Sequence, residues 1–132
     1  MDAELRERIL SELEEAGEEN IPTLANTVFD ATGIEVERSQ LKAALLSLVE
    51  SGLVRVAVER DNQERLIEIS KEESLGILKD IERSLVFSND RNCWTGGPRP
   101  WPEIVLTDQG AVAARGVLDA RGYQWWRRGD HA

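Results

Sequence analysis

The chain has 132 residues, of which 41% are hydrophobic and 31% charged, and its formal net charge is −9. This length is typical of one domain that buries a core without crosslinks, and no apolar run approaches the roughly 20 residues of a membrane-spanning helix. The single cysteine, Cys93, excludes an intrachain disulfide. Because the first residues lack the basic and apolar regions of a signal peptide, we expect a cytoplasmic protein.

The negative charge is concentrated in the first part of the sequence. Residues 1–76 contain 18 acidic and 8 basic side chains, a balance of −10, whereas residues 77–132 contain 7 and 8, a balance of +1. A nucleic-acid-binding surface is usually a basic patch, but screening over about 10 Å means that the local pattern of charge decides. The net charge therefore lowers the expectation of a nucleic-acid partner without excluding one.

Two amphipathic helices are predicted at the start of the chain. Residues 3–16 place apolar side chains at helical spacing, and Gly17 ends this segment. Residues 18–20 are interpreted as the connection to the next helix. That second helix begins with Thr23 as its N-cap and ends at Gly33.

A third helix and a β-hairpin are predicted for residues 37–70. The helix covers residues 37–52, with leucines at helical spacing and a glycine as its stop. Residues 53–60 and 64–70 then alternate between apolar and polar side chains and are rich in β-branched residues, as in paired strands. The short polar segment between them, residues 61–63, is the predicted turn.

Two further helices are predicted after the hairpin. Ser70 and Glu73 form a capping box that begins a fourth helix, which is expected to extend to about residue 83. Thr107 is the predicted N-cap of a last helix, which ends near Arg121.

The segment between these two helices is the least regular part of the sequence. Residues 84–88 and 101–106 each contain an apolar run that fits a short strand, and residues 89–100 between them have the Gly and Pro content of a loop. A second hairpin with a long tip, formed by pairing of these two strands, is one interpretation of residues 84–106, and an irregular cover is the alternative. Long loops of this kind are often functional.

The order of helices and hairpin in residues 3–70 resembles the winged helix-turn-helix superfamily. Residues 48–54 (LVESGLV) are similar to the segment that joins recognition helix and wing in small bacterial regulators. Residues 104–110 (IVLTDQG) are similar to the strand-to-helix junction of the MarR and PadR regulators. In those families this junction follows the wing directly, whereas a helix and a long loop intervene in this sequence.

The resemblance implies an α+β fold that is mainly α. Residues 1–70 would form a winged helix-turn-helix of three helices and a β-hairpin wing. Residues 71–126 would form a C-terminal extension of helices and a short hairpin, with a long Gly/Pro/Trp loop, packed on the first part. Residues 127–132 are expected to be a flexible tail.

The resemblance also implies a way of binding double-stranded DNA, in which the third helix enters the major groove and the wing contacts phosphates or the minor groove. Arginine and lysine suit guanine, and glutamine suits adenine. The polar residues at these positions are Arg38, Ser39, Gln40 and Lys42 on the helix and Arg60, Asn62 and Arg65 on the wing. The acidic residues that oppose DNA contact are Glu37, Glu59, Asp61 and Glu64. A solvated polar surface, or contact with a protein, is the equal alternative.

No residue set for catalysis or metal binding is recognised in the sequence. His131 is the only histidine, and its place next to the chain terminus makes it a poor platform for a catalytic triad or a metal site. Cys93, beside Trp94, is interpreted as an inert or packed cysteine, with redox sensing as the lesser alternative. The paired glutamates at residues 14–15 and 18–19 lack the pattern of a calcium loop and indicate a solvated acidic face. We therefore expect no enzyme activity, no cofactor and no metal.

All four tryptophans lie in the second part of the chain, at Trp94, Trp101, Trp125 and Trp126. One interpretation is that they pack within the chain and pin the C-terminal helix to the winged helix. The other is an interface, because tryptophan is enriched at interface hot spots. Terminal helices commonly pair the subunits of small winged-helix regulators, so the resemblance implies a homodimer through residues 71–126.

Two functions follow as hypotheses. The first is a small cytoplasmic winged-helix protein that binds DNA and regulates transcription. The alternative is an acidic winged-helix module that binds a protein partner through its first helix and its tryptophan-rich region, without binding DNA. A continuous positive strip along the third helix and wing would favour the first, and unbroken negative potential would favour the second.

Overall fold

The computed structural model describes residues 3–29, 35–59 and 66–127, which form an α+β fold with more helix than strand, as predicted. The described α-helices are α1 (Ala3–Ala16), α2 (Ile21–Val28), α3 (Glu35–Glu50), α4 (Lys71–Lys79) and α5 (Asp108–Arg121). Short 3-10 helices cover Ile81–Arg83 and Trp125–Arg127. The described strands are β1 (Glu18–Asn20), β2 (Val54–Glu59), β3 (Leu66–Glu68), β4 (Val86–Ser88), β5 (Cys93–Thr95) and β6 (Glu103–Leu106).

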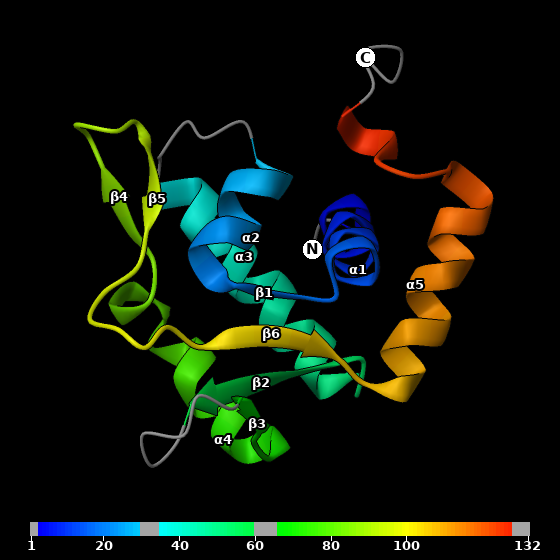
Figure 1. Ribbon diagram of the computed structural model, residues 1–132, viewed down its shortest axis with the longest axis horizontal. Coiled ribbons are helices and arrows are strands. Elements are labelled where there is room, and N and C mark those ends of the chain that lie inside the picture. Colours follow the sequence, from blue (N-terminus) through cyan, green and yellow to red (C-terminus); the bar gives the residue numbers. More distant parts are fainter. Residues whose placement is uncertain (1–2, 30–34, 60–65, 128–132) are drawn as a thin grey trace.

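Four of these strands form one antiparallel sheet in the order β1-β6-β2-β3 (Figure 1). β6 lies between β1 and β2, with Ile104 opposite Glu19 on one side and Val56 on the other. β4 and β5 pair only with each other and form a separate two-stranded hairpin. The predicted pairing of residues 84–88 with residues 101–106 is therefore wrong.

The reason for this difference lies in loop length and burial. Only residues 89–92 separate β4 from β5, which suits a local hairpin. β6 carries the fully buried Ile104, and a central position in the sheet gives its backbone hydrogen-bonding partners on both sides. Residues 18–20, interpreted from the sequence as a connection, form the edge strand β1 beside it.

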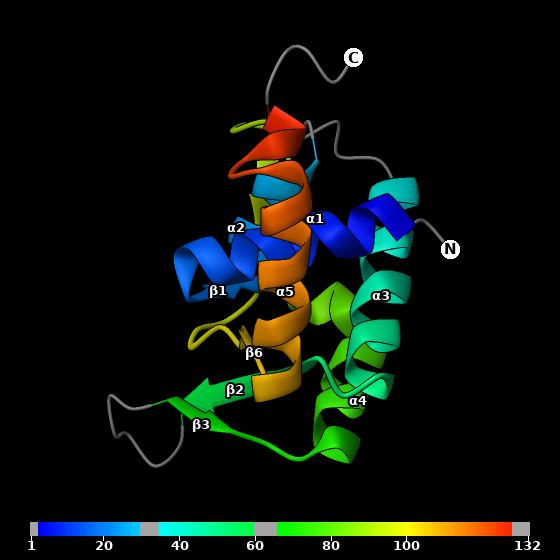
Figure 2. The same cartoon turned by 90° about the vertical axis from the view of Figure 1, so that its right-hand side faces the viewer.

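The helices are arranged around α1. α1 lies between α5 on one side and α2 and α3 on the other (Figure 1). Figure 2 shows α5 crossing in front of α1, so that the last long helix covers the first. The hydrophobic core runs from Leu5 in α1 to Ala114 in α5 and includes Ile104 of the sheet. It therefore contains side chains from both predicted segments, residues 1–70 and residues 71–126.

The helix starts depend on local hydrogen bonds, and two of the three predicted N-caps are confirmed. The hydroxyl group of Ser70 accepts a hydrogen bond from the backbone N–H of Glu73 at 3.1 Å, and Thr107 caps α5 in the same way at 3.0 Å. The prediction of Thr23 as the N-cap of α2 is wrong. Asn20 is the cap, because its Oδ1 accepts from the N–H of Thr23 at 2.9 Å.

The helix ends agree with the sequence to within a few residues. α3 begins at Glu35, two residues earlier than predicted, and is followed by Gly52, whose φ of 78° lies in the left-handed region that favours glycine. α4 is shorter than predicted, and the 3-10 helix Ile81–Arg83 continues it after a break. The prediction that the second helix continues to Gly33 is wrong, because α2 ends at Val28 and its C-cap, Phe29, is extended. The turn at residues 61–63 and almost all of the tail lie outside the described residues.

Candidate functional site

The N-terminal part of α3, predicted to read DNA bases, lies against the β4–β5 hairpin. The indole N–H of Trp94 in β5 donates to Oε1 of Glu37 at 3.4 Å, and both residues are buried. The side-chain amide of Asn26 in α2 donates to the C=O of Trp94 at 2.9 Å and accepts from its N–H at 2.8 Å. Glu37, predicted to oppose phosphates at the surface, is therefore directed into the interior, where it helps to hold the hairpin.

Arg38 has three partners within the chain. Its Nη1 donates to the backbone C=O of Leu85 at 3.2 Å, and its Nη2 forms an ion pair with Glu35. Its Cζ also lies 5.9 Å from the centroid of the Trp94 ring, within the range of a cation–π contact. A DNA phosphate would therefore have to compete with a carboxylate, a carbonyl group and an aromatic ring for this guanidinium.

The other predicted DNA-contacting residues of α3 are more accessible. Ser39 and Gln40 are exposed, while Lys42 is half-buried with its Nζ 3.8 Å from Oε1 of Glu82. A pocket of about 240 Å³ follows this part of α3 and is lined by two acidic and two basic side chains, Glu35, Glu82, Arg38 and Lys42, among others. The predicted wing residues lie outside the described part of the chain: Arg60, Asn62 and Arg65.

The four-stranded sheet has a second face, opposite to the one that carries the core residues Val54, Val56 and Ile104. Side chains alternate along strands, and the pairing register places one set of alternate residues together on this outer face. They are Glu18, Asn20, Glu103, Val105, Arg55, Ala57, Glu59, Leu66 and Glu68. The outer face therefore carries four carboxylates and one arginine.

The arginine of the outer face, Arg55, donates hydrogen bonds to backbone carbonyl groups. Nη1 of Arg55 donates to the C=O of Val54 at 2.8 Å and to the C=O of Val49 at 3.3 Å. Among the described residues, no ion pair joins any of the four carboxylates to an arginine or lysine. On α3, in contrast, Arg38 and Lys42 each form an ion pair with a carboxylate of the same chain.

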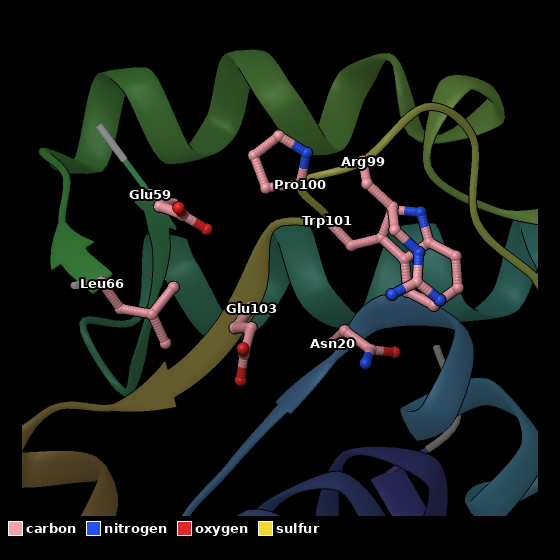
Figure 3. Close-up of a pocket in the computed structure, with 7 residues that line it drawn as sticks. All are labelled: Asn20, Glu59, Leu66, Arg99, Pro100, Trp101 and Glu103. Atoms are coloured by element: carbon pink, nitrogen blue, oxygen red, sulfur yellow. The ribbon is translucent and has the colours of Figure 1, made fainter. Parts of the chain in front are cut away.

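A pocket of about 610 Å³ opens beside the outer face (Figure 3). This volume lies within the range of about 300–1,000 Å³ that is usual for ligand sites. The strands contribute four lining residues, and the loop before β6 contributes the other three. They are Asn20, Glu59, Leu66 and Glu103 from the strands, and Arg99, Pro100 and Trp101 from the loop.

The wall formed by the loop is built around the Trp101 ring. Its indole N–H donates to the C=O of Gly97 at 2.7 Å, and Cζ of Arg99 lies 4.4 Å from its centroid. A Cβ atom at Gly96 would overlap the ring, and one at Gly97 would overlap the carbonyl oxygen of Arg83. Both positions therefore require glycine for the backbone to pass this close.

Glu103 lines the pocket together with two other titratable side chains, Glu59 and Arg99. Its neighbours in the register are Asn20 on β1 and Ala57 on β2, neither of which carries a charge. Burial raises the pKa of Glu103 above its ordinary value of 4.5, and repulsion from the carboxylate of Glu18 raises it further. A cation placed in the pocket would relieve both effects.

Three of the four tryptophans predicted at an interface are buried within the single chain. Trp94, Trp125 and Trp126 are 3%, 6% and 5% exposed. The indole N–H of Trp125 donates to Oγ of Ser11 at 3.0 Å, and that of Trp126 donates to a backbone C=O of α2 at 3.3 Å. These contacts fit the packing interpretation for the three residues, and Trp101 is the partly exposed member of the set. The homodimer stays a prediction.

The acidic side of α1 also has partners within the chain. Oε1 of Glu14 lies 3.3 Å from Nε of Arg115 in α5, and Oε2 of Glu15 accepts from the backbone N–H of Gln124 at 3.1 Å. Both contacts lie at the surface, so these two glutamates are partly solvated and also join α1 to the C-terminal part of the chain.

The sequence analysis did not identify Asn20, Arg99 or Glu103 as site residues. One signal was present, because a strand over residues 103–106 places Glu103 on the face opposite to Ile104. The residues near β6 in the sequence do not indicate which strands lie beside it. The pocket forms because β1 and β2 are its neighbours in the sheet.

Cys93 in β5 is partly buried and has a free thiol group. In residues 3–29, 35–59 and 66–127, no group of three or more His, Cys, Asp or Glu side chains is placed to hold a metal ion. Over the same ranges, no helix combines the length and apolar character needed to cross a membrane. Comparisons with protein-family models, curated proteins and solved structures found no match for this chain.

Proposed function

We propose that this protein is an interaction module, built on a winged-helix framework, that binds a basic protein segment on the outer face of its sheet. The observation that carries this proposal is the charge of that face. Four carboxylates, including Glu59 and Glu103, lie beside a single arginine, and the guanidinium of that residue, Arg55, donates to backbone carbonyl groups. A lysine- or arginine-rich segment is the partner that complements such a surface.

The charge of the whole chain supports the same kind of partner. A net charge of −9 attracts cationic partners over long range and repels nucleic acid. Ion pairs on α3 further disfavour nucleic acid, because Arg38 is already paired with Glu35 and Lys42 with Glu82. Phosphate binding at α3 would have to replace these contacts, whereas binding at the outer face would satisfy carboxylates that lack a described cation.

DNA binding by α3, with a role in transcription regulation, is the second candidate function. The observation that favours it is the exposure of Ser39 and Gln40 in the first half of a helix that is followed by the β2–β3 hairpin. Both side chains can hydrogen-bond to base edges. On this hypothesis the ion pairs of α3 would open when the phosphate backbone approached.

A binding titration distinguishes the two functions. A fluorescent peptide with several arginines and a matched peptide with citrulline, which is isosteric and neutral, are titrated with the protein in about 50 mM salt, where charge-driven binding is strong. We expect the arginine peptide to bind and the citrulline peptide not to bind. The double variant Glu59→Lys/Glu68→Lys should weaken arginine-peptide binding by about tenfold or more, since two attractive contacts become repulsive.

The control carries the same change of charge away from the outer face. Asp90→Lys/Asp119→Lys alters the exposed turn between β4 and β5 and the exposed side of α5, and it should retain most of the affinity. If the two double variants lose affinity equally, the outer face is not the docking surface. If duplex DNA binds with a steep salt dependence, is sensitive to Gln40→Ala, and the arginine peptide does not bind, the DNA function replaces the proposal.

A further inference from the structure

We propose that the pocket beside the outer face accepts one arginine side chain of the basic partner, and that Arg99 occupies its aromatic wall in the free protein. This inference rests on the proposed function for the identity of the partner. The pocket shares Glu59 and Glu103 with the outer face, but its aromatic wall, Trp101 with Arg99, is not part of that face. Probes of Trp101 and Arg99 therefore test the pocket separately from docking on the outer face.

The aromatic wall already binds a guanidinium group. Arg99 lies with its Cζ 4.4 Å from the centroid of the Trp101 ring, the geometry of a stacked cation–π pair. The indole N–H is committed to the C=O of Gly97, so the ring itself is the part of Trp101 that a ligand can use. A guanidinium is planar and weakly hydrated, and it stacks on aromatic rings more readily than the compact ammonium group of lysine.

Two carboxylates line the same pocket as this ring. Glu59 at the end of β2 and Glu103 at the start of β6 come from adjacent strands, and Figure 3 shows both among the lining side chains. Opposite Glu103 in the register is Ala57, a small residue that leaves room between the two acidic groups. A guanidinium presents five N–H donors in one plane and can bind carboxylates in a bidentate manner while it stacks.

Arg99 is therefore an internal competitor for the site. Its side chain is exposed, and the contact that places it over the pocket wall is the stack on Trp101. An incoming arginine can reach this ring only by displacing Arg99 into solvent. Removal of Arg99 should uncover the ring and strengthen binding, which is the opposite of what removal of a ligand-binding residue does.

The test uses a single-arginine probe, N-acetyl-Gly-Arg-Gly-amide, with lysine and citrulline versions for comparison. Binding is followed by the indole N–H signal of Trp101 in two-dimensional NMR, which the Trp101→Phe variant identifies. We expect the arginine probe to shift this signal, the lysine probe to bind more weakly and the citrulline probe to have no effect. Arg99→Ala should tighten arginine binding by about two- to fivefold, the equivalent of one exposed cation–π contact.

The matched control removes a different arginine. Arg91→Ala makes the same change in net charge at the exposed turn of the β4–β5 hairpin, and it should leave the affinity unchanged. If Arg99→Ala weakens binding or leaves it unchanged, Arg99 is not a competitor. If the arginine probe does not shift the Trp101 signal, or if the lysine probe binds equally well, the pocket is not an arginine site.

The two proposals fail in different ways. If the long arginine peptide binds and responds to Glu59→Lys/Glu68→Lys while the Trp101 signal stays in place, docking on the outer face stands and the pocket inference is overturned. If the tripeptide binds in the pocket but the long arginine peptide binds no more tightly than the tripeptide, the pocket inference stands and the proposed function is overturned.

Discussion

The N-terminal part of α3 carries acidic and basic side chains in equal number, whereas the outer face of the sheet is mainly acidic. On α3, Arg38 and Lys42 are each paired with a carboxylate of the same chain, and Arg38 is also bonded to a backbone carbonyl group. On the outer face, Glu59 and Glu103 have no described cation in an ion pair, and the neighbouring arginine is turned to the backbone. The charged groups of the first region therefore make contacts within the chain, whereas the carboxylates of the second have no ion-pair partner among the described residues.

This contrast shows that the number of charged residues in a region does not tell how many of them are paired within the chain. From the sequence, the polar residues on α3 are compatible with DNA binding, and the acidic residues both oppose it and support the alternative of a protein partner. In the folded chain, Glu37 is buried against Trp94 and contributes to packing, whereas Glu103 becomes part of a pocket. Which charges a partner can reach thus depends on contacts between segments that are distant in sequence.

The largest effect that can test this comparison is the removal of one tryptophan from each region. Trp94→Ala removes a buried ring that packs edge-on against Phe87 and donates to Glu37, so it should lower the free energy of unfolding by about 3–5 kcal/mol. Trp101→Ala removes a partly exposed ring and its hydrogen bond to Gly97, and should cost about 1 kcal/mol. Urea denaturation measures both values, and equal losses would show that the two regions do not differ as described.

The pH dependence of stability should respond to Glu103. Since the pKa of Glu103 is higher in the folded than in the unfolded chain, the folded state binds this proton more tightly, and the resulting stabilisation is complete below about pH 4.5 and lost as the pH rises through the raised pKa. Glu103→Gln should therefore melt at a higher temperature than the wild type at pH 7. The advantage should disappear near pH 4.

The same titration should govern ligand binding. The other charged groups around Glu103 are Glu18 on β1, Glu59 and Arg55 on β2, and Arg99 in the loop. A cationic ligand favours the ionised carboxyl group, so the affinity for the arginine probe should rise as the pH increases above 4.5. Affinity that is flat across this range in the wild type, or that rises equally in Glu103→Gln, would assign the pH dependence to another group.

The smallest effect is expected at the ion pair of α3. The side chains of Lys42 and Glu82 are both partly exposed and lie 3.8 Å apart, so Lys42→Ala should change the free energy of unfolding by about 0.5 kcal/mol or less. A double-mutant cycle with Glu82→Ala isolates the pair, and the coupling should shrink further in high salt. A coupling energy well above 1 kcal/mol would mean that this part of α3 is held more firmly than its exposure indicates.

The elements that could be predicted from the sequence depend on neighbours within a few residues. Ser70 and Thr107 cap their helices as predicted, because an N-cap bonds an amide two or three residues further along the chain. The wrong prediction of Thr23 as an N-cap is also a local one. Asn20, another residue type that caps helices, lies only three positions earlier and is the cap of α2. Residues 3–16 form α1 over the predicted range because the apolar spacing of a helix is a local pattern.

The candidate site could be predicted only in part. Trp101 was a candidate for internal packing or an interface, and Glu59 was an acidic residue opposing DNA contact. Their common pocket requires the loop before β6 to lie beside β2. The three buried tryptophans show the same limit. Nothing near Trp94, Trp125 or Trp126 in the sequence indicates the distant groups that accept their indole N–H groups. These acceptors are Glu37, Ser11 and the backbone C=O of Thr27, respectively.

The sequence by itself determined that this protein is α+β and mainly helical, with a helix, helix, helix and hairpin order near its start, because periodicity, caps and turn residues act over short distances. The tertiary structure decided that β6 lies between β1 and β2, that the cations of α3 are paired, and that four carboxylates share the outer face. Strand order and ion pairing depend on which distant segments the core brings together. The hydrophobic effect rewards the burial of apolar side chains whatever their separation along the chain.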